Sequence, residues 1–121
     1  MKTIKLLFAI LLVLATFQTA HAQSDKTQRS IGIKTENIKV SGTCDMDKRR
    51  IETTSYTVQG VKSAVWNMYS QTLILIYSVF EKDAPDIVQK KIASVGNDTE
   101  KYRADDAVYK KLPDCCHYQR K

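Results

Sequence analysis

Three features of the sequence predict an α+β sandwich, with two helices covering one face of a four-stranded antiparallel sheet. Segments with alternating apolar residues, typical of strands, are separated by segments with helical spacing. The segments follow in the order strand, helix, strand, strand, helix, strand. Gly60 and Gly96 come directly after the two predicted helices, at positions where helices commonly end.

The first predicted strand ends at Val40, where Ile38 and Val40 alternate with polar residues. The apolar spacing changes phase near residues 36–37, which indicates an irregularity or a separate arm before the strand. Residues 48–59 are predicted to form a helix that ends before Gly60. β-Branched residues make this segment a weak helix former. Its expected inward face consists of Ile51, Thr54, Ser55 and Val58.

A hairpin is predicted next, from strands 61–69 and 72–78 joined by Ser70 and Gln71. The second of these strands has apolar residues on both faces, so the sheet face away from the helices is not fully polar. Pro85 lies at the start of a second helix, and residues 98–103 are predicted to form a short fourth strand. This order of elements is the split βαβ arrangement of a ferredoxin-like sandwich.

The first 22 residues are predicted to be a cleavable secretory signal peptide. Lys2 and Lys5 form its basic region, ten apolar residues follow over positions 6–15, and Ala20-His21-Ala22 provides a cleavage site. The apolar run is shorter than the roughly 17–25 residues of a transmembrane helix, so we expect a mature chain that does not span a membrane. Cleavage after Ala22 predicts a periplasmic or secreted protein.

Length and charge exclude several other classes. A chain of 121 residues fits one small domain. The net charge falls from +6 to +4 once Lys2 and Lys5 are removed, and the remaining basic residues are interleaved with acids. That pattern is typical of a solvated surface and not of a nucleic-acid-binding stripe. Because no Ser/His/Asp or paired-carboxylate constellation is present, we do not expect an enzyme. The predicted organisation is a signal peptide (1–22), a flexible lead-in or arm (23–36), a domain (37–103), and a C-terminal helix and tail (104–121).

Three cysteines are the residues best suited to chemistry. Cys44 follows a glycine turn between the first strand and helix, where a loop can hold a thiolate away from the core. Cys115, Cys116 and His117 follow a predicted short helix over residues 104–112. That helix, roughly 13 Å long at about 1.5 Å per residue, could return over the open face of the sheet and bring the tail cysteines beside Cys44.

Residues spread over positions 37–103 also carry a family resemblance. They are Gly42-Thr43-Cys44, Ile51-Glu52, Gly60-Val61, Ala64, Asn67, Tyr77 and Gly96. With them the chain resembles the heavy-metal-associated domain of copper chaperones, metal-pumping ATPases and periplasmic mercury-binding proteins. The tail, including Leu112-Pro113-Asp114-Cys115-Cys116-His117-Tyr118, resembles an exported bacterial branch of that family. The resemblance implies a βαββαβ fold, a soft metal ion bound at the loop after the first strand, and a metal-transporting membrane protein or metal-acceptor domain as partner.

The loop departs from the family pattern at the position of its second cysteine. That cysteine would fall three residues after Cys44, where this chain has Asp47. The methionine that usually follows the glycine is also missing. The loop therefore supplies only one of the two thiolates that it would need to capture Cu(I) or Hg(II) by itself. We expect a mixed site of Cys44, Cys115 and His117, with Asp47 as a candidate fourth ligand. Cys116 takes the place of Cys115 if the chain turns there.

The leading hypothesis is therefore an exported protein that sequesters or delivers a soft metal ion, copper first, with zinc or mercury as alternatives. The other hypothesis is a degenerate domain that acts as a structural or protein-interaction module, with Cys44 in a disulfide to a tail cysteine. Asp47 also suits a helix cap, which we favour over ligation. Met46 is expected to be a loop or packing residue rather than a thioether ligand.

Overall fold

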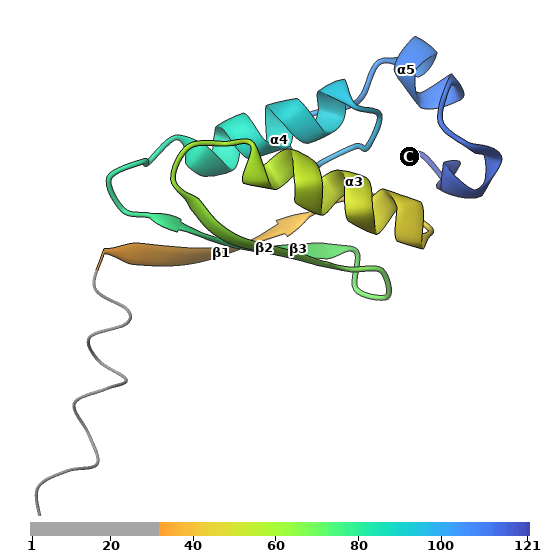
Figure 1. Ribbon diagram of the computed structural model, residues 1–121. Coiled ribbons are helices and arrows are strands. Elements are labelled where there is room, and N and C mark those ends of the chain that lie inside the picture. The colour runs from red at the N-terminus through yellow and green to blue at the C-terminus, as the bar shows by residue number, and fades with distance from the viewer. Residues whose placement is uncertain (1–31) are drawn as a thin grey trace, which may run out of the picture. The chain divides into compact units, whose positions relative to one another are not determined.

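The computed structural model describes residues 32–121, drawn in colour in Figure 1. The predicted signal peptide and the lead-in up to residue 31 lie outside the described residues. Among those described, no helix is both long and apolar enough to cross a lipid bilayer. The elements are, in order, β1 (Ile33–Lys39), α3 (Asp45–Tyr56), β2 (Val61–Asn67), β3 (Thr72–Ser78), α4 (Ala84–Ser94), α5 (Asp106–Lys110) and a 3-10 turn, η2 (Asp114–Cys116).

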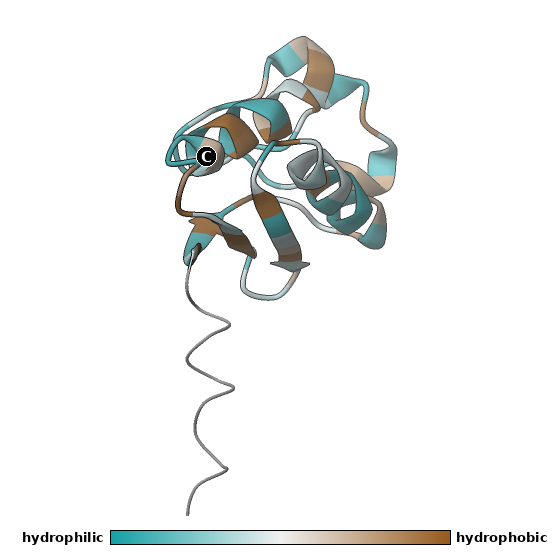
Figure 2. Ribbon diagram, turned by 60° about the vertical axis from the view of Figure 1, so that its left-hand side comes forward, coloured by the Kyte–Doolittle hydropathy of each residue, from teal (hydrophilic) through white to brown (hydrophobic). Residues whose placement is uncertain are grey.

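The three strands form an antiparallel sheet in the order β1-β3-β2, and α3 and α4 lie together on one of its faces (Figure 1). The strands alternate as the sequence predicts, since one side of each is buried beneath the helices. Leu73, in the middle strand, lies opposite Ile38 of β1 and Trp66 of β2. The core contains these residues together with Ile51, Val58, Leu75, Tyr77, Val88 and Ile92. Hydrophobic residues of the strands and of α4 appear brown in Figure 2.

Helix α3 begins at Asp45, three residues before the predicted start at residue 48. Cys44, which precedes it, has an extended backbone (φ −146°, ψ 171°), so the helical hydrogen bonds begin directly after this residue. Asp45 and Asp47 occupy the first turn, where negative charge is favourable to the helix dipole. The inward-facing residues Ile51 and Ser55 are buried, as predicted.

Strand β1 runs unbroken through residues 36–37, where the sequence suggested an irregularity. The change in apolar spacing reflects a change of face, because Glu36 takes an inward-facing position on the same side as Ile38. The Glu36 carboxylate accepts a hydrogen bond from the Tyr77 hydroxyl at 3.3 Å. Ile33 lies half-buried on the other face.

The predicted fourth strand, residues 98–103, is reduced to a single antiparallel bridge between Val40 and Thr99. The chain reverses directly after this bridge, since the Thr99 N–H donates to the Tyr102 carbonyl at 2.8 Å. Pairing alongside β1 therefore cannot continue. In the described residues the expected four-stranded sheet consists of three strands and one bridge.

The C-terminal tail does not cover the open face of the sheet, contrary to the expectation from the sequence. Helix α5 has five residues instead of the nine predicted over 104–112. The tail packs on the helix side of the sheet, at the end where α3 begins (Figure 1). Gly96, with φ +112°, allows this packing, because a Cβ there would meet the Leu112 side chain at 2.8 Å. Val65 and Ile74 stay exposed on the outer sheet face.

Candidate metal centre

The loop between β1 and α3 is fixed at Gly42. A Cβ at this position would come within 2.9 Å of both Trp66 and Asp47, so only glycine fits. Gln71, from the hairpin turn, accepts a hydrogen bond from the Gly42 N–H at 2.9 Å and donates one to the Gly42 carbonyl at 2.7 Å. Cys44 therefore lies two residues after a backbone position, Gly42, that is fixed by close packing and by two hydrogen bonds.

The tail brings two more sulfur atoms to this loop. The Cys116 Sγ lies 3.0 Å from the Cys44 Sγ and 3.9 Å from the Cys115 Sγ. All three thiols are free, and their sulfurs lie within 4.8 Å of one another. The 3-10 turn Asp114–Cys116 explains why both adjacent cysteines reach the same place, because an extended chain would direct them to opposite sides. The Thr43 hydroxyl donates a hydrogen bond to the Cys115 carbonyl.

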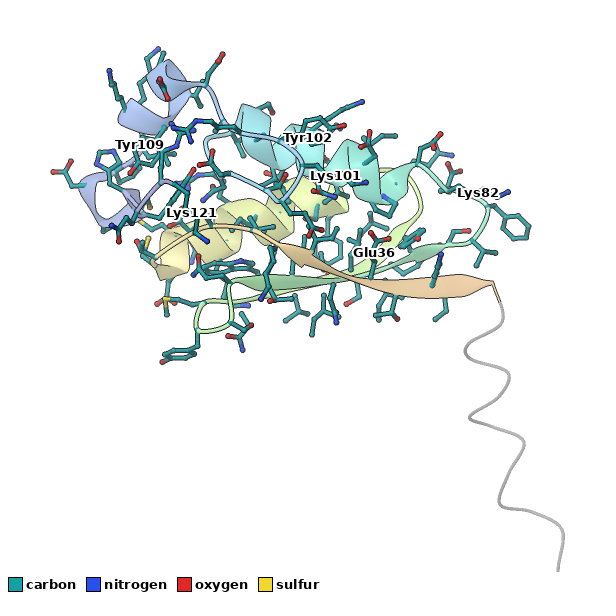
Figure 3. All side chains as sticks on the ribbon, turned by 180° about the vertical axis from the view of Figure 1, so that it is seen from behind. Glu36, Lys82, Lys101, Tyr102, Tyr109 and Lys121 are labelled. Atoms are coloured by element: carbon teal, nitrogen blue, oxygen red, sulfur yellow. The ribbon has the colours of Figure 1, made fainter. Side chains whose placement is uncertain are left out.

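The tail is anchored by polar contacts beyond the thiols. The Tyr118 hydroxyl donates to the Gly96 carbonyl at 2.7 Å and accepts from the Asp98 N–H at 2.8 Å. Burial raises the pKa of Tyr118 to about 12, so this hydroxyl keeps its proton at neutral pH. Arg120 forms a two-pronged ion pair with Asp98, at 2.9 and 2.7 Å. Tyr109, beside the tail, and Lys82 lie at opposite ends of the described fold (Figure 3).

The Arg120–Asp98 pair predicts how the protein responds to acid. Burial raises the pKa of the Asp98 carboxyl, but hydrogen bonds from Arg120 and the Ala104 N–H outweigh this effect and hold the pKa below its ordinary value of 3.8. The pair therefore stabilises the fold above that ordinary value, and the contribution is lost as the pH falls through the lowered pKa. We expect Arg120→Gln to lower the free energy of unfolding at pH 7 and to lessen its decrease below about pH 4.

Urea unfolding of both proteins at pH 7 and pH 3 measures this difference. Lys90→Gln is the control, because Lys90 pairs with Asp86 at a more exposed site, with side chains 59% and 36% exposed. That variant should change stability little. If Arg120→Gln lowered stability by the same amount at both pH values, the ion pair would not be the cause.

Asp47, predicted as a candidate fourth ligand, is fully buried and bonded to the protein. Its Oδ2 accepts from the Thr43 N–H at 2.8 Å, and its Oδ1 accepts from Arg50 at 2.7 Å and from the Asn97 amide at 2.9 Å. The Cys44 Sγ lies 3.6 Å from Oδ2. Oδ2 thus holds the backbone one residue before the N-cap Cys44, and Oδ1 joins α3 to Asn97, so neither oxygen makes the predicted bond to the N-cap.

His117 also lies apart from the thiols. Its exposed ring packs against Tyr109, with ring centroids 5.1 Å apart and planes tilted by 36°. The group of metal-competent atoms within 4.8 Å comprises Cys44, Cys115 and Cys116 and contains neither His117 nor Asp47. Of the predicted site residues, the structure therefore brings together the three cysteines.

The two nearest thiols have opposite pKa shifts. Burial raises the pKa of Cys44, but hydrogen bonds from the Cys116 thiol and the backbone of Asp47, among others, outweigh it and lower this pKa below its usual range. Burial, followed by the hydrogen bond to Cys44, raises the pKa of Cys116 to about 12, although Arg50 opposes this rise. Within this pair the thiolate is therefore favoured at Cys44. An ion that binds both sulfurs must displace the proton of Cys116, which couples metal binding to pH.

Two residues near the site were missed by reasoning from the sequence, Arg50 and Asn97. Arg50 Nη2 lies 3.7 Å from the Cys116 Sγ, while its Nη1 contacts Asp47. The three-residue spacing of Asp47 and Arg50 on one helix was a usable signal. Asn97 donates to the Ser41 carbonyl at 2.9 Å as well as to Asp47. Its role has no sequence signal, because it depends on how the ends of α4 and β1 meet.

Comparison with known proteins supports the fold. No protein-family model matches the chain, and no curated protein matches it. A solved structure of a CopZ metallochaperone is 25% identical with a TM-score of 0.51, over 55% of this chain and 98% of that one. The water-soluble region of the P-type ATPase CopA from Bacillus subtilis is 30% identical with a TM-score of 0.48, over 55% of this chain and 44% of that one. The described fold is therefore a small α+β fold similar to that of the metallochaperone.

Proposed function

From three free thiols at one end of a metallochaperone-like fold, we infer that this protein binds one soft metal ion, Cu(I) first, at Cys44, Cys115 and Cys116. The observation that carries the proposal is the distance between the sulfurs, all within 4.8 Å of one another. Thiolates are soft ligands that select Cu(I) and related ions. The ion is the protein's cargo, and its role is delivery or sequestration instead of catalysis.

The exposure of the three thiols suits a cargo that must enter and leave. Cys116 is buried, Cys44 is half-buried and Cys115 is exposed. An incoming ion can therefore reach Cys115 and Cys44 from solvent, while Cys116 holds it from the protein side. A metal-transporting membrane protein or a metal-acceptor domain is the partner class that such a carrier would meet. Export through the predicted signal peptide, with a mature chain starting at Gln23, is part of this proposal.

The ligand set favours copper over zinc. Structural zinc sites are almost always four-coordinate, with thiolate, imidazole or carboxylate ligands. Here the nearby carboxylate, Asp47, is bonded to protein donors, and the nearby imidazole, His117, packs against Tyr109. Mercury remains an alternative cargo, because it is also thiophilic.

The test is a competition titration of the reduced mature chain with Cu(I) and a chelator under anaerobic conditions. We expect one ion per chain, and none in a control sample whose thiols have been alkylated. Equal uptake by the alkylated chain would contradict the proposal, as would no uptake by the reduced one. Export is tested separately by fractionating cells and determining whether the periplasmic chain begins at Gln23.

A structural disulfide is the second candidate, and the 3.0 Å between the sulfurs of Cys44 and Cys116 favours it. Such a bond would stabilise the fold by about 2–4 kcal/mol and leave Cys115 free. Counting thiols in protein isolated without reductant separates the two candidates. Three reactive thiols after metal removal support the metal carrier, and one supports the disulfide.

A further inference from the structure

Met46 is an exposed thioether beside the three thiols. It is the second residue of α3, two positions after Cys44, and 49% of its surface is exposed. Its Sδ lies 3.6 Å from the Cys115 Sγ. From the sequence we expected a loop or packing residue, but a side chain this exposed contributes little to the core.

The neighbouring candidates for a fourth ligand are already engaged. The Asp47 carboxylate accepts hydrogen bonds at both oxygens, and the His117 ring packs against Tyr109. The Met46 sulfur, by contrast, has a thiol as its neighbour. Cys115 thus lies between two other sulfurs, the Cys116 Sγ at 3.9 Å and the Met46 Sδ at 3.6 Å.

We propose that the Met46 thioether is a fourth ligand of the site, and that this thioether favours Cu(I)-class ions over Zn²⁺. This inference rests on the proposed function. A thioether is a soft ligand that suits Cu(I), whereas zinc sites use thiolate, imidazole and carboxylate. It also adds a bond without adding charge. The absence of added charge matters because three thiolates around a monovalent cation already give the site a net negative charge. Among the described contacts, Arg50 provides a counter-charge, with its Nη2 3.7 Å from the Cys116 Sγ.

The first test compares metal affinities of the reduced mature chain and of Met46→Leu, which keeps the size of the side chain and removes the sulfur. We expect the affinity for Cu(I) to fall about tenfold or more, with the affinity for Zn²⁺ and the thermal unfolding midpoint unchanged. Met68→Leu is the matched control, since Met68 packs against the core, and should change neither affinity. Unchanged Cu(I) affinity in Met46→Leu would overturn the inference, and so would an equal loss for both metals.

The second test detects the ligand directly. Protein labelled with selenomethionine and loaded with Cu(I) should show a selenium neighbour in the X-ray absorption spectrum of copper, and Met46→Leu should abolish it. Copper surrounded by sulfur alone in the labelled protein would overturn the role of Met46 and leave the proposed function intact. If the reduced chain took up no Cu(I), the proposed function itself would fail.

Discussion

Replacing Cys44 by serine is expected to lower the affinity for Cu(I) by more than the roughly 10–100-fold that loss of a second-shell partner costs at a metal site. Cys44 is the only proposed thiol ligand from the loop, and its lowered pKa favours the thiolate that binds a soft ion. The fold should survive, because serine is a favoured residue at the N-cap position that Cys44 occupies. Chelator competition under reducing, anaerobic conditions measures the change.

His117→Gln is the matched control for this experiment. The imidazole lies next to Cys116 in sequence but packs against Tyr109, so its loss should leave Cu(I) affinity unchanged. Cys116→Ser should weaken binding as Cys44→Ser does, because the two sulfurs are 3.0 Å apart. Undiminished affinity in Cys44→Ser would remove the loop from the site and leave the tail as the binding element.

Replacing Asp47 by alanine is expected to destabilise the metal-free protein by about 3 kcal/mol, because one partner of a buried ion pair is removed. The Asp47 side chain is 0% exposed, and that of Arg50 is 20% exposed. Without the carboxylate, Arg50 loses its ion-pair partner, and the Thr43 N–H and Asn97 amide each lose an acceptor. Urea unfolding of the reduced chain measures the difference in free energy.

Asp45→Ala is the control for the same helical turn. Asp45 is exposed in the first turn of α3, so its loss removes only a favourable interaction with the helix dipole, less than about 1 kcal/mol. If Asp47→Ala and Asp45→Ala were equally stable, the buried contacts of Asp47 would contribute nothing beyond its charge. A larger decrease in the free energy of unfolding for Asp47→Ala would show that the Asp47 side chain anchors the loop before α3.

Much of the fold could be predicted because its core follows local periodicity. The hairpin strands and the inward-facing positions of Ile51, Leu73 and Trp66 follow from the spacing of apolar residues, every two residues in a strand and every 3.6 in a helix. Each spacing can be read within a single segment of the sequence. The fourth strand could not be predicted in the same way. Its pairing with the end of β1 stops after one bridge, because the Thr99 N–H bonds to the Tyr102 carbonyl. The spacing of apolar residues does not reveal which partner this N–H takes.

The grouping of the three cysteines at the candidate site was predictable in part, for a related reason. Residue types alone singled out Cys44 and the tail cysteines, and the structure brings them together. The route of the tail was wrong, since it packs at the end of the helix layer and leaves the sheet face open. How a short segment docks depends on shape, here on the space beside Gly96 that Leu112 fills. The environments of Asp47 and Met46 depend on that docking too.

Cys44 and Cys116 lie 72 positions apart in the chain. An ion that bridges them would therefore act as a reversible cross-link between the loop after β1 and the C-terminal tail, and its binding energy would add to the stability of the docked tail. The loaded tail should resist proteolysis better than the empty one. An acceptor protein that displaces the tail would remove two of the three thiols, Cys115 and Cys116, from the ion in a single movement. Release of the ion would then depend on the opening of one short segment instead of the exchange of ligands one at a time.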